Sequence, residues 1–207
     1  MIIVSKSLRY LRAIFRTLES IFVQVRFEVS LLLNNVEHKS ITINGMPYIA
    51  VVQGGKCIFG NNLSLNSGLR FNPIGYPQPC SIVVTKGAVL KIGCNVGLSQ
   101  ASIICHHSIT IEDNVKIGGG VKVYDTNFHT LNPDIRRNHE QDMANKKVAP
   151  VVIKHDAFIG AGSIILPGVT IGANSIVGAG SVVTKNIPDN QIWGGNPAKY
   201  IKDVPYE

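Results

Sequence analysis

His129 is the residue whose type and position in this sequence best suit acid–base chemistry. It stands where a regular repeat gives way to a polar segment, and an imidazole titrates near neutrality, so it can accept a proton at physiological pH. Asp125 lies four residues upstream, where a carboxylate can orient the imidazole or favour its cationic form. The plain alternatives are a surface or packed histidine and an aspartate that forms a turn.

A six-residue repeat is the element that must position these side chains. An aliphatic residue recurs at every sixth position near the C-terminus, at Ile153, Ile159, Ile165, Ile171, Val177 and Val183. Mostly small residues stand two positions earlier. A unit of this length suits a short strand and a turn, three units to a coil, and the coils must stack because none can bury its own apolar face. The sequence therefore predicts an all-β fold, a parallel β-helix.

The same period returns upstream with irregularities. Ile92 and Leu98 are six residues apart, and a one-residue slip separates them from a second series, Cys105, Ile111, Ile117 and Val123. A weaker version covers residues 58–89. The period then breaks over residues 124–150, which are polar, and an insertion in a solenoid is expelled as a loop that is often functional. We therefore expect an extruded loop that carries His129.

The two ends of the chain depart from the repeat. Residues 1–35 form a segment in which apolar residues follow helical spacing, at Leu8, Leu11, Ile14, Phe15, Leu18, Phe22 and Val23. Basic residues lie off that stripe, at Lys6, Arg9, Arg12 and Arg16. Such a helix either caps the first coil or docks on an anionic membrane surface. The β-helix domain is then residues 36–207, with prolines breaking regular structure in a tail, residues 187–207.

Composition narrows the function classes. The net charge of +7 favours anionic partners, but no basic stripe interleaved with aromatics and no nucleic-acid-binding motif is present, so nucleic acid is not an expected partner. The four cysteines form no CxxC pair and are expected to be free thiols in a reducing compartment. The apolar stretch 20–33 carries Arg26 and Glu28 and is a poor membrane span. We expect a cytoplasmic protein, with peripheral contact to the inner membrane surface through the helix left open.

A family resemblance becomes specific in the C-terminal coils. The stretch Ile153–Lys202, IKHDAFIGAGSIILPGVTIGANSIVGAGSVVTKNIPDNQIWGGNPAKYIK, closely resembles the hexapeptide-repeat O-acetyltransferases, which include the maltose, galactoside, nodulation-factor and capsular polysaccharide acetyltransferases. Residues 125–129 resemble the D-x-D-F-H element of the polysaccharide branch, with Asn127 in place of the second aspartate. The resemblance covers residues 58–202. It implies a left-handed β-helix, a homotrimer with sites between subunits, and acetyl transfer from acetyl-CoA to a hydroxyl of a sugar or surface-polysaccharide precursor.

The resemblance also implies residue roles, with His129 as the general base. Positions that match cofactor contacts are Ala161, Ala179, Thr184 and Lys185, together with Lys199 and Lys202, whose charges suit the phosphates of coenzyme A. Candidates for the acceptor pocket are Ser99, Gln100, His106 and Asn127. The acidic residue and asparagine of the simple sugar acetyltransferases are absent near these positions, so maltose and galactoside are not the expected acceptors.

Other functions remain open at this point. The same scaffold supports N-acylation of an amino sugar, and serine O-acetylation, although enzymes of the latter group carry a much longer helical N-terminal region. A non-catalytic solenoid that acts as a binding scaffold is the alternative from another class. The γ-carbonic anhydrases bind zinc on the same repeat through three histidines, and His106, His107 and His129 are conceivable ligands. The loop context of His129 fits a transferase better, so no metal is expected.

Overall fold

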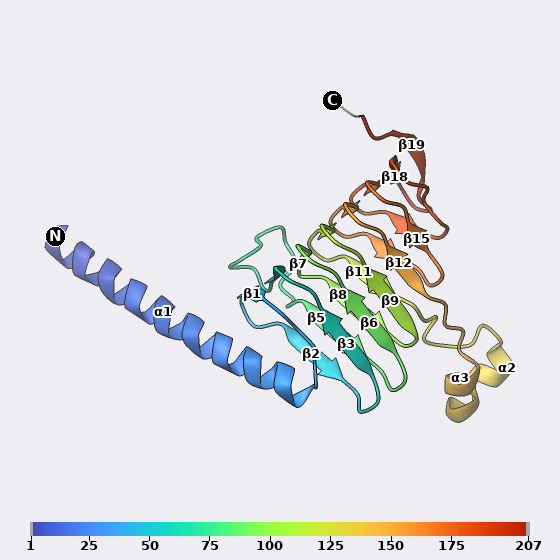
Figure 1. Ribbon diagram of the computed structural model, residues 1–207, viewed down its shortest axis with the longest axis horizontal. Coiled ribbons are helices and arrows are strands. Elements are labelled where there is room, and N and C mark those ends of the chain that lie inside the picture. The colour runs from blue at the N-terminus through green and yellow to red at the C-terminus, as the bar shows by residue number, and fades with distance from the viewer. Residues whose placement is uncertain (1, 206–207) are drawn as a thin grey trace.

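The computed structural model describes residues 2–205, with the side chains of residue 9 and residues 11–205, and it shows one continuous solenoid preceded by a long helix (Figure 1). Three sheets of stacked parallel strands wrap around a common core, so the predicted left-handed parallel β-helix is confirmed. The last two strands pair antiparallel, and an isolated antiparallel bridge joins Thr126 to Val148 at the base of the loop. Each of the five complete coils, from β1 to β15, gives one strand to each sheet, as a three-sided coil requires.

The bounds of the strands follow sheet by sheet. The eight-stranded sheet contains β1 (Ile41–Asn44), β4 (Leu63–Asn66), β7 (Gly97–Ser99), β10 (Lys116–Ile117), β13 (Phe158–Ile159), β16 (Ile176–Val177), β18 (Gln191–Gly194) and β19 (Lys199–Asp203). The six-stranded sheet contains β2 (Tyr48–Val51), β5 (Ser81–Val84), β8 (Ser102–Cys105), β11 (Lys122–Tyr124), β14 (Ile164–Ile165) and β17 (Val182–Val183). The five-stranded sheet contains β3 (Lys56–Phe59), β6 (Val89–Ile92), β9 (Ser108–Ile111), β12 (Val151–Ile153) and β15 (Thr170–Ile171).

The aliphatic residues of the repeat stack on one another inside the solenoid. Ile117 pairs with Ile159, and Ile159 pairs with Val177 in the next coil, and all three side chains are buried. Small residues are required two positions earlier because the corner is tight. Ser163 is fully buried there, and its hydroxyl donates a hydrogen bond to the Gly178 carbonyl at 3.0 Å. At this corner the small residue therefore packs tightly while its buried hydroxyl remains hydrogen-bonded.

The upstream irregularity differs in detail from the prediction. Ile103, five residues after Leu98, stacks on Val123 of the next coil. Cys105 occupies an additional inward position and pairs with Val84 of the preceding coil. The strands of these early coils are thus long enough to bury an extra residue, which a strict six-residue period cannot show.

Two excursions leave the stack. The predicted loop between β11 and β12 is present and contains two short helices, α2 (Pro133–Arg136) and α3 (His139–Asn145), which project from one corner (Figure 1). A second excursion, residues 67–80, separates β4 from β5 and lies within the stretch for which the sequence indicated only a weak repeat. Both excursions are anchored by buried polar side chains at their bases, as described below.

The C-terminal end of helix α1 (Ile2–Leu33) caps the first coil, and the rest of the helix extends away from that coil (Figure 1). Phe27 and Leu31 are buried at 0% and 1% exposure, so the capping alternative is correct for this part of the helix. Of the apolar residues noted in the sequence, Val23 is half-buried, and the side chain of Leu8 lies outside the described residues. None of the described helices combines the length and apolar character needed to cross a membrane.

Candidate active site

The extruded loop begins at Asp125, directly after β11. The Asp125 side chain is fully buried, with Oδ2 lying 3.6 Å from the Cys105 sulfur. Its carboxylate accepts hydrogen bonds at 2.6–2.7 Å from three consecutive backbone N–H groups of the coil beneath, those of His106, His107 and Ser108. The predicted orienting role of Asp125 is therefore corrected: the carboxylate is used to fasten the base of the loop, which is the turn-forming alternative.

A different carboxylate contacts His129. The Nδ1 atom of His129 lies 2.6 Å from Oδ2 of Asp142, whose Oδ1 accepts a hydrogen bond from the Thr130 N–H at 2.7 Å. Because an ionised carboxylate only accepts, Nδ1 carries the hydrogen in the neutral ring and Nε2 keeps its lone pair. The side chain of His129 is 61% exposed and that of Asp142 only 5%. An accessible imidazole held in this tautomer by a buried carboxylate has the form of a general base.

Local sequence signals bring this pair together. The side-chain oxygen of Asn138 accepts a hydrogen bond from the Gln141 N–H at 3.0 Å, so α3 begins at the next residue and turns Asp142 toward the loop interior. On the other side, the backbone turns at Phe128, which has a φ of +60°. Sequence reasoning missed Asp142 because it lies thirteen residues beyond His129. The helix cap at Asn138 was the one signal that could have located it.

The electrostatics of Asp142 follow from the same contacts. The hydrogen bond with His129 lowers the pKa of Asp142 below its usual 3.8, the Thr130 N–H acts in the same direction, and desolvation opposes them. A carboxyl whose folded-state pKa is depressed stabilises the fold above its unfolded pKa, and this contribution is lost as the pH falls through the lower folded-state value. Asp142 is therefore ionised at neutral pH, as its contact with the imidazole requires.

Replacing Asp142 with asparagine should lower kcat without unfolding the loop. The asparagine oxygen can still accept from the Thr130 N–H, but the charge beside His129 is lost. A hydrogen bond to a charged group contributes about 1.5–3 kcal/mol, or roughly a 10- to 150-fold loss if it acts fully in the transition state. Steady-state kinetics of Asp142→Asn beside Glu140→Gln, an exposed control on the same helix, tests this. Equal kcat values for the two variants would contradict the assignment.

His106 lies at the same corner of the solenoid. Its Nδ1 is 3.0 Å from the Nζ of Lys146, and its ring meets the Phe128 ring edge to face, with centroids 5.9 Å apart. Burial, and next the charge of Lys146, lower the pKa of His106 below its usual 6.5, with Asp125 opposing the shift. His106 is therefore neutral at neutral pH. Because an ammonium group only donates, Nδ1 is the acceptor and Nε2 carries the hydrogen.

The four residues predicted for the acceptor pocket divide between two corners. His106 and the exposed Asn127 lie at the base of the extruded loop together with His129. Ser99 and Gln100 lie at the preceding corner, where the eight-stranded sheet turns into the six-stranded sheet. One chain therefore brings only the first two to the candidate base.

The side chain of Gln100 is used within the fold. It is fully buried, and its Nε2 donates hydrogen bonds to the carbonyl oxygens of Asn72, at 2.9 Å, and Tyr76. Gln100 therefore anchors the 67–80 excursion and has no surface to offer an acceptor, which corrects that prediction. Ser99 accepts a hydrogen bond from the Asn66 side chain at 3.2 Å on the face of the sheet.

The residues matched to cofactor contacts lie toward the C-terminal end of the stack. They are Ala161, Ala179, Thr184, Lys185, Lys199 and Lys202. Ala161 and Ala179 succeed one another at the corner between the eight- and six-stranded sheets. Thr184 and the three lysines are exposed, with the Nζ of Lys185 lying 5.4 Å from the Trp193 ring. This corner and the corner that carries His129 are different edges of the chain.

The described residues contain no group of three histidine, cysteine, aspartate or glutamate side chains placed to hold a metal ion. Two of the three conceivable zinc ligands are engaged otherwise, His129 with Asp142 and His106 with Lys146. The four cysteines are free, as predicted, and burial raises the pKa of both Cys57 and Cys105 to about 12. These thiols are therefore packing residues rather than nucleophiles.

Two models of known protein families match the repeat region of this chain. Residues 92–125 match the family described as hexapeptide repeat of succinyl-transferase, and residues 150–185 match the bacterial transferase hexapeptide family of six repeats. The fold and its histidine-bearing loop thus define a protein of the hexapeptide transferase class.

Individual relatives narrow the class. The putative lipopolysaccharide biosynthesis O-acetyltransferase WbbJ of Escherichia coli K12 is 30% identical over 188 residues, which cover 88% of this chain and 89% of that protein. The chain therefore belongs to the hexapeptide-repeat O-acetyltransferase family. The galactoside O-acetyltransferase of the same organism is 36% identical over 57% of this chain. The match spans 56% of that enzyme, about half of its length.

A solved structure shares the fold. A hexapeptide-repeat acetyltransferase from Vibrio cholerae, determined in complex with acetyl-coenzyme A, superimposes with a TM-score of 0.51 at 32% identity. The superposition covers 56% of this chain and 61% of that one.

Proposed function

We propose that the protein transfers an acetyl group from acetyl-CoA to a hydroxyl of a sugar or surface-polysaccharide precursor. The observation that carries the proposal is the His129–Asp142 pair, an exposed imidazole fixed by a buried carboxylate on the loop extruded from a hexapeptide β-helix. The names of the relatives support the chemistry, since both Escherichia coli proteins are described as O-acetyltransferases. The acetyl-coenzyme A complex of the Vibrio cholerae protein supports the donor.

The reaction follows from the tautomer. Nε2 of His129 takes the proton of the acceptor hydroxyl as its oxygen attacks the thioester carbonyl, and the ionised Asp142 stabilises the imidazolium that forms. The tetrahedral intermediate then collapses, the carbon–sulfur bond breaks, and the coenzyme A thiolate leaves. The imidazolium returns the proton to sulfur, so the products are the acetyl ester and free coenzyme A. No covalent enzyme intermediate is required.

A site shared between subunits of a homotrimer fits the placement of the residues. His129 lies at the corner between the six- and five-stranded sheets, whereas Ala161 and Ala179 lie at the corner between the eight- and six-stranded sheets. Two corners of one three-sided prism face different directions, but neighbouring prisms can place one corner of each in a common groove. We therefore assign the base to one subunit and part of the cofactor groove to the next.

The surroundings of His129 suit a sugar acceptor. Phe128 stacks edge to face with both His106 and Tyr124, at centroid distances of 5.9 and 5.3 Å. Aromatic surface combined with a neutral donor such as the His106 Nε2–H offers a polyhydroxylated ring both an apolar face and a hydrogen bond. We therefore propose His106 and Asn127 as contacts of the acceptor. Ser99 lies at the adjacent corner of the same chain and is not one of these contacts.

Coenzyme A release in the presence of an acceptor panel tests the function. Thiol release should require the enzyme and a sugar or nucleotide-sugar acceptor, and serine should not replace it. The acetylated product should be cleaved by hydroxylamine, because esters react and amides do not. A product that resists hydroxylamine would be an amide, and the same site would then catalyse N-acylation rather than O-acetylation.

Coenzyme A alone should raise the melting temperature of the purified protein. A ligand that binds only the folded state at about 100 times its dissociation constant adds about 2.7 kcal/mol, which corresponds to roughly 5–11 °C for a domain of this size. Differential scanning fluorimetry with coenzyme A, and with adenosine as the control, measures the shift. An unchanged melting temperature together with no acetyl transfer to any acceptor would favour a non-catalytic scaffold.

A further inference from the structure

Helix α1 has two faces with different surroundings. Near its C-terminal end, Phe27 and Leu31 are buried against the first coil. The opposite face carries apolar residues that are each 49–80% exposed, Leu11, Ile14, Phe15, Leu18, Ile21, Phe22, Val25, Val29, Leu32 and Leu33. At 100° per residue these ten fall within an arc of about 120° centred opposite Phe27. We call this arc the apolar stripe, and it faces away from the stacked coils.

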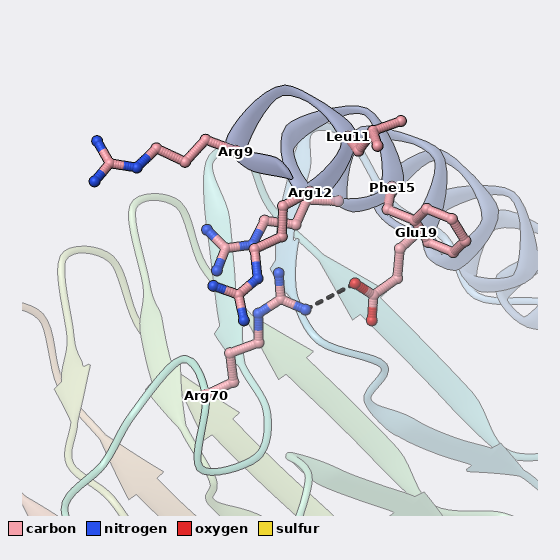
Figure 2. A pocket seen from close by; sticks show the side chains of 7 residues that line it. Arg9, Leu11, Arg12, Phe15, Glu19 and Arg70 are labelled. Atoms are coloured by element: carbon pink, nitrogen blue, oxygen red, sulfur yellow. Dashed lines mark hydrogen bonds and ion pairs between the residues drawn. The ribbon is translucent and has the colours of Figure 1, made fainter. Parts of the chain in front are cut away.

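Arginines gather off the stripe. Arg9, Arg12 and Arg16 of the helix and Arg70 of the 67–80 excursion line one cavity, with Glu19 as its single carboxylate. Figure 2 shows Arg12 and Arg70 directed into the same space, with the ion pair from Arg70 to Glu19, 2.7 Å long. Leu11 and Phe15, at the edge of the apolar stripe, also line the cavity. The cavity therefore has an excess of positive charge beside a helix whose other face is apolar.

We propose that α1 docks on an anionic membrane surface, with the apolar stripe in the acyl boundary and the arginine cavity on lipid phosphates. An interfacial helix sinks its apolar face about 5–10 Å below the headgroups, and a helix with side chains is about 10–12 Å wide. The face opposite the stripe then lies at the level of the phosphates. The guanidinium groups of Arg12 and Arg70 can bind phosphate oxygens there in a bidentate manner.

A second copy of the chain is the competing occupant of the stripe. Seven residues of the stripe alternate by four and three positions along its whole length, as a coiled-coil seam would: Leu11, Phe15, Leu18, Phe22, Val25, Val29 and Leu32. In a parallel pair, however, the flanking Ile14 would face Glu19 of the other copy, so charged residues are not matched with opposite charges. Isoleucine at the flank also makes the stripe wider than a two-stranded seam.

Charge favours the membrane. The described part of α1 carries four arginines, Arg9, Arg12, Arg16 and Arg26, against two glutamates, Glu19 and Glu28, and all six lie off the stripe. The whole protein has a net charge of +7. A basic polar face opposite leucine and phenylalanine is the pattern of helices that lie in an anionic interface. This docking is independent of the proposed acyl transfer.

Vesicle flotation of the full-length protein tests the proposal. Wild-type protein should float with phosphatidylcholine–phosphatidylglycerol vesicles and much less with phosphatidylcholine alone. Arg12→Gln should lower the partition constant about five-fold, because each basic residue near an anionic surface contributes about that factor. The control is Arg137→Gln, at an exposed arginine of the extruded loop. It removes the same charge at a position far from α1 in the sequence and should leave partitioning unchanged. Equal effects of the two substitutions would overturn the proposal.

The stripe is tested by Phe22→Ser against Thr17→Ala. Both positions are exposed, so neither substitution should affect folding. Phe22→Ser should lower anionic-vesicle binding about ten-fold or more, since it removes a large apolar group that the membrane would bury. Thr17→Ala should leave the binding unchanged. Sedimentation velocity of each variant completes the experiment. If Phe22→Ser leaves vesicle binding intact but reduces the size of the assembly, the stripe is a contact between copies and the membrane proposal fails.

Discussion

Replacing His129 with alanine is expected to lower kcat/KM for acetyl transfer by about 10²–10⁴-fold, the usual contribution of a positioned general base. The imidazole is 61% exposed, so alanine leaves the core untouched. Asp142 loses one partner but keeps the Thr130 N–H, and the loop should therefore retain its shape. The loss should appear mainly in kcat, because the proton moves only in the transition state.

The control for this variant lies in the same loop. His139 is an exposed histidine at the first position of α3, and His139→Ala should retain wild-type kinetics. Both variants should melt near the wild-type temperature and bind coenzyme A as the wild type does. A His129→Ala protein that folds, binds coenzyme A and turns over a true acceptor at the wild-type rate would rule out the mechanism.

The repeat made the C-terminal half of the fold predictable. Each six-residue unit from Ile153 onward buries its own aliphatic residue, and the paired registers of Ile153 with Ile171 and of Ile159 with Val177 follow directly. The earlier coils were harder because their strands bury extra residues such as Cys105. The 67–80 excursion was hidden because its anchor, Gln100, looks like a surface polar residue in the sequence.

The candidate site was predictable only where local sequence decides geometry. His129 marks the exit of the chain from the repeat, so its position alone singled it out. Its partner was misassigned because Asp125 is near in sequence whereas Asp142 is near in space. Side chains joined through a folded loop depend on how α3 is capped and oriented, and a six-residue period carries no information about that.

Asp125→Ala should cost stability, and this separates its role from that of Asp142. The substitution orphans three backbone N–H groups, those of His106, His107 and Ser108. An unsatisfied buried donor costs about 1–3 kcal/mol. Because these three N–H groups are only partly buried, water can rescue them in part, and the total should be about 3 kcal/mol, or roughly 6–12 °C in melting temperature. Asp134→Ala, at an exposed aspartate of the same loop, is the matched control and should melt within about 1 °C of wild type.

Asp125→Asn distinguishes a structural carboxylate from a catalytic one. Its single side-chain oxygen can accept up to two hydrogen bonds, so part of the melting temperature should return, and acetyl transfer should return with it as the base of the loop tightens. If Asp125 instead acted on His129, the asparagine variant would melt near wild type yet lose as much activity as Asp142→Asn. The three amides that Asp125 binds make the first outcome the expected one, because the same oxygens cannot also reach the imidazole that Asp142 already holds.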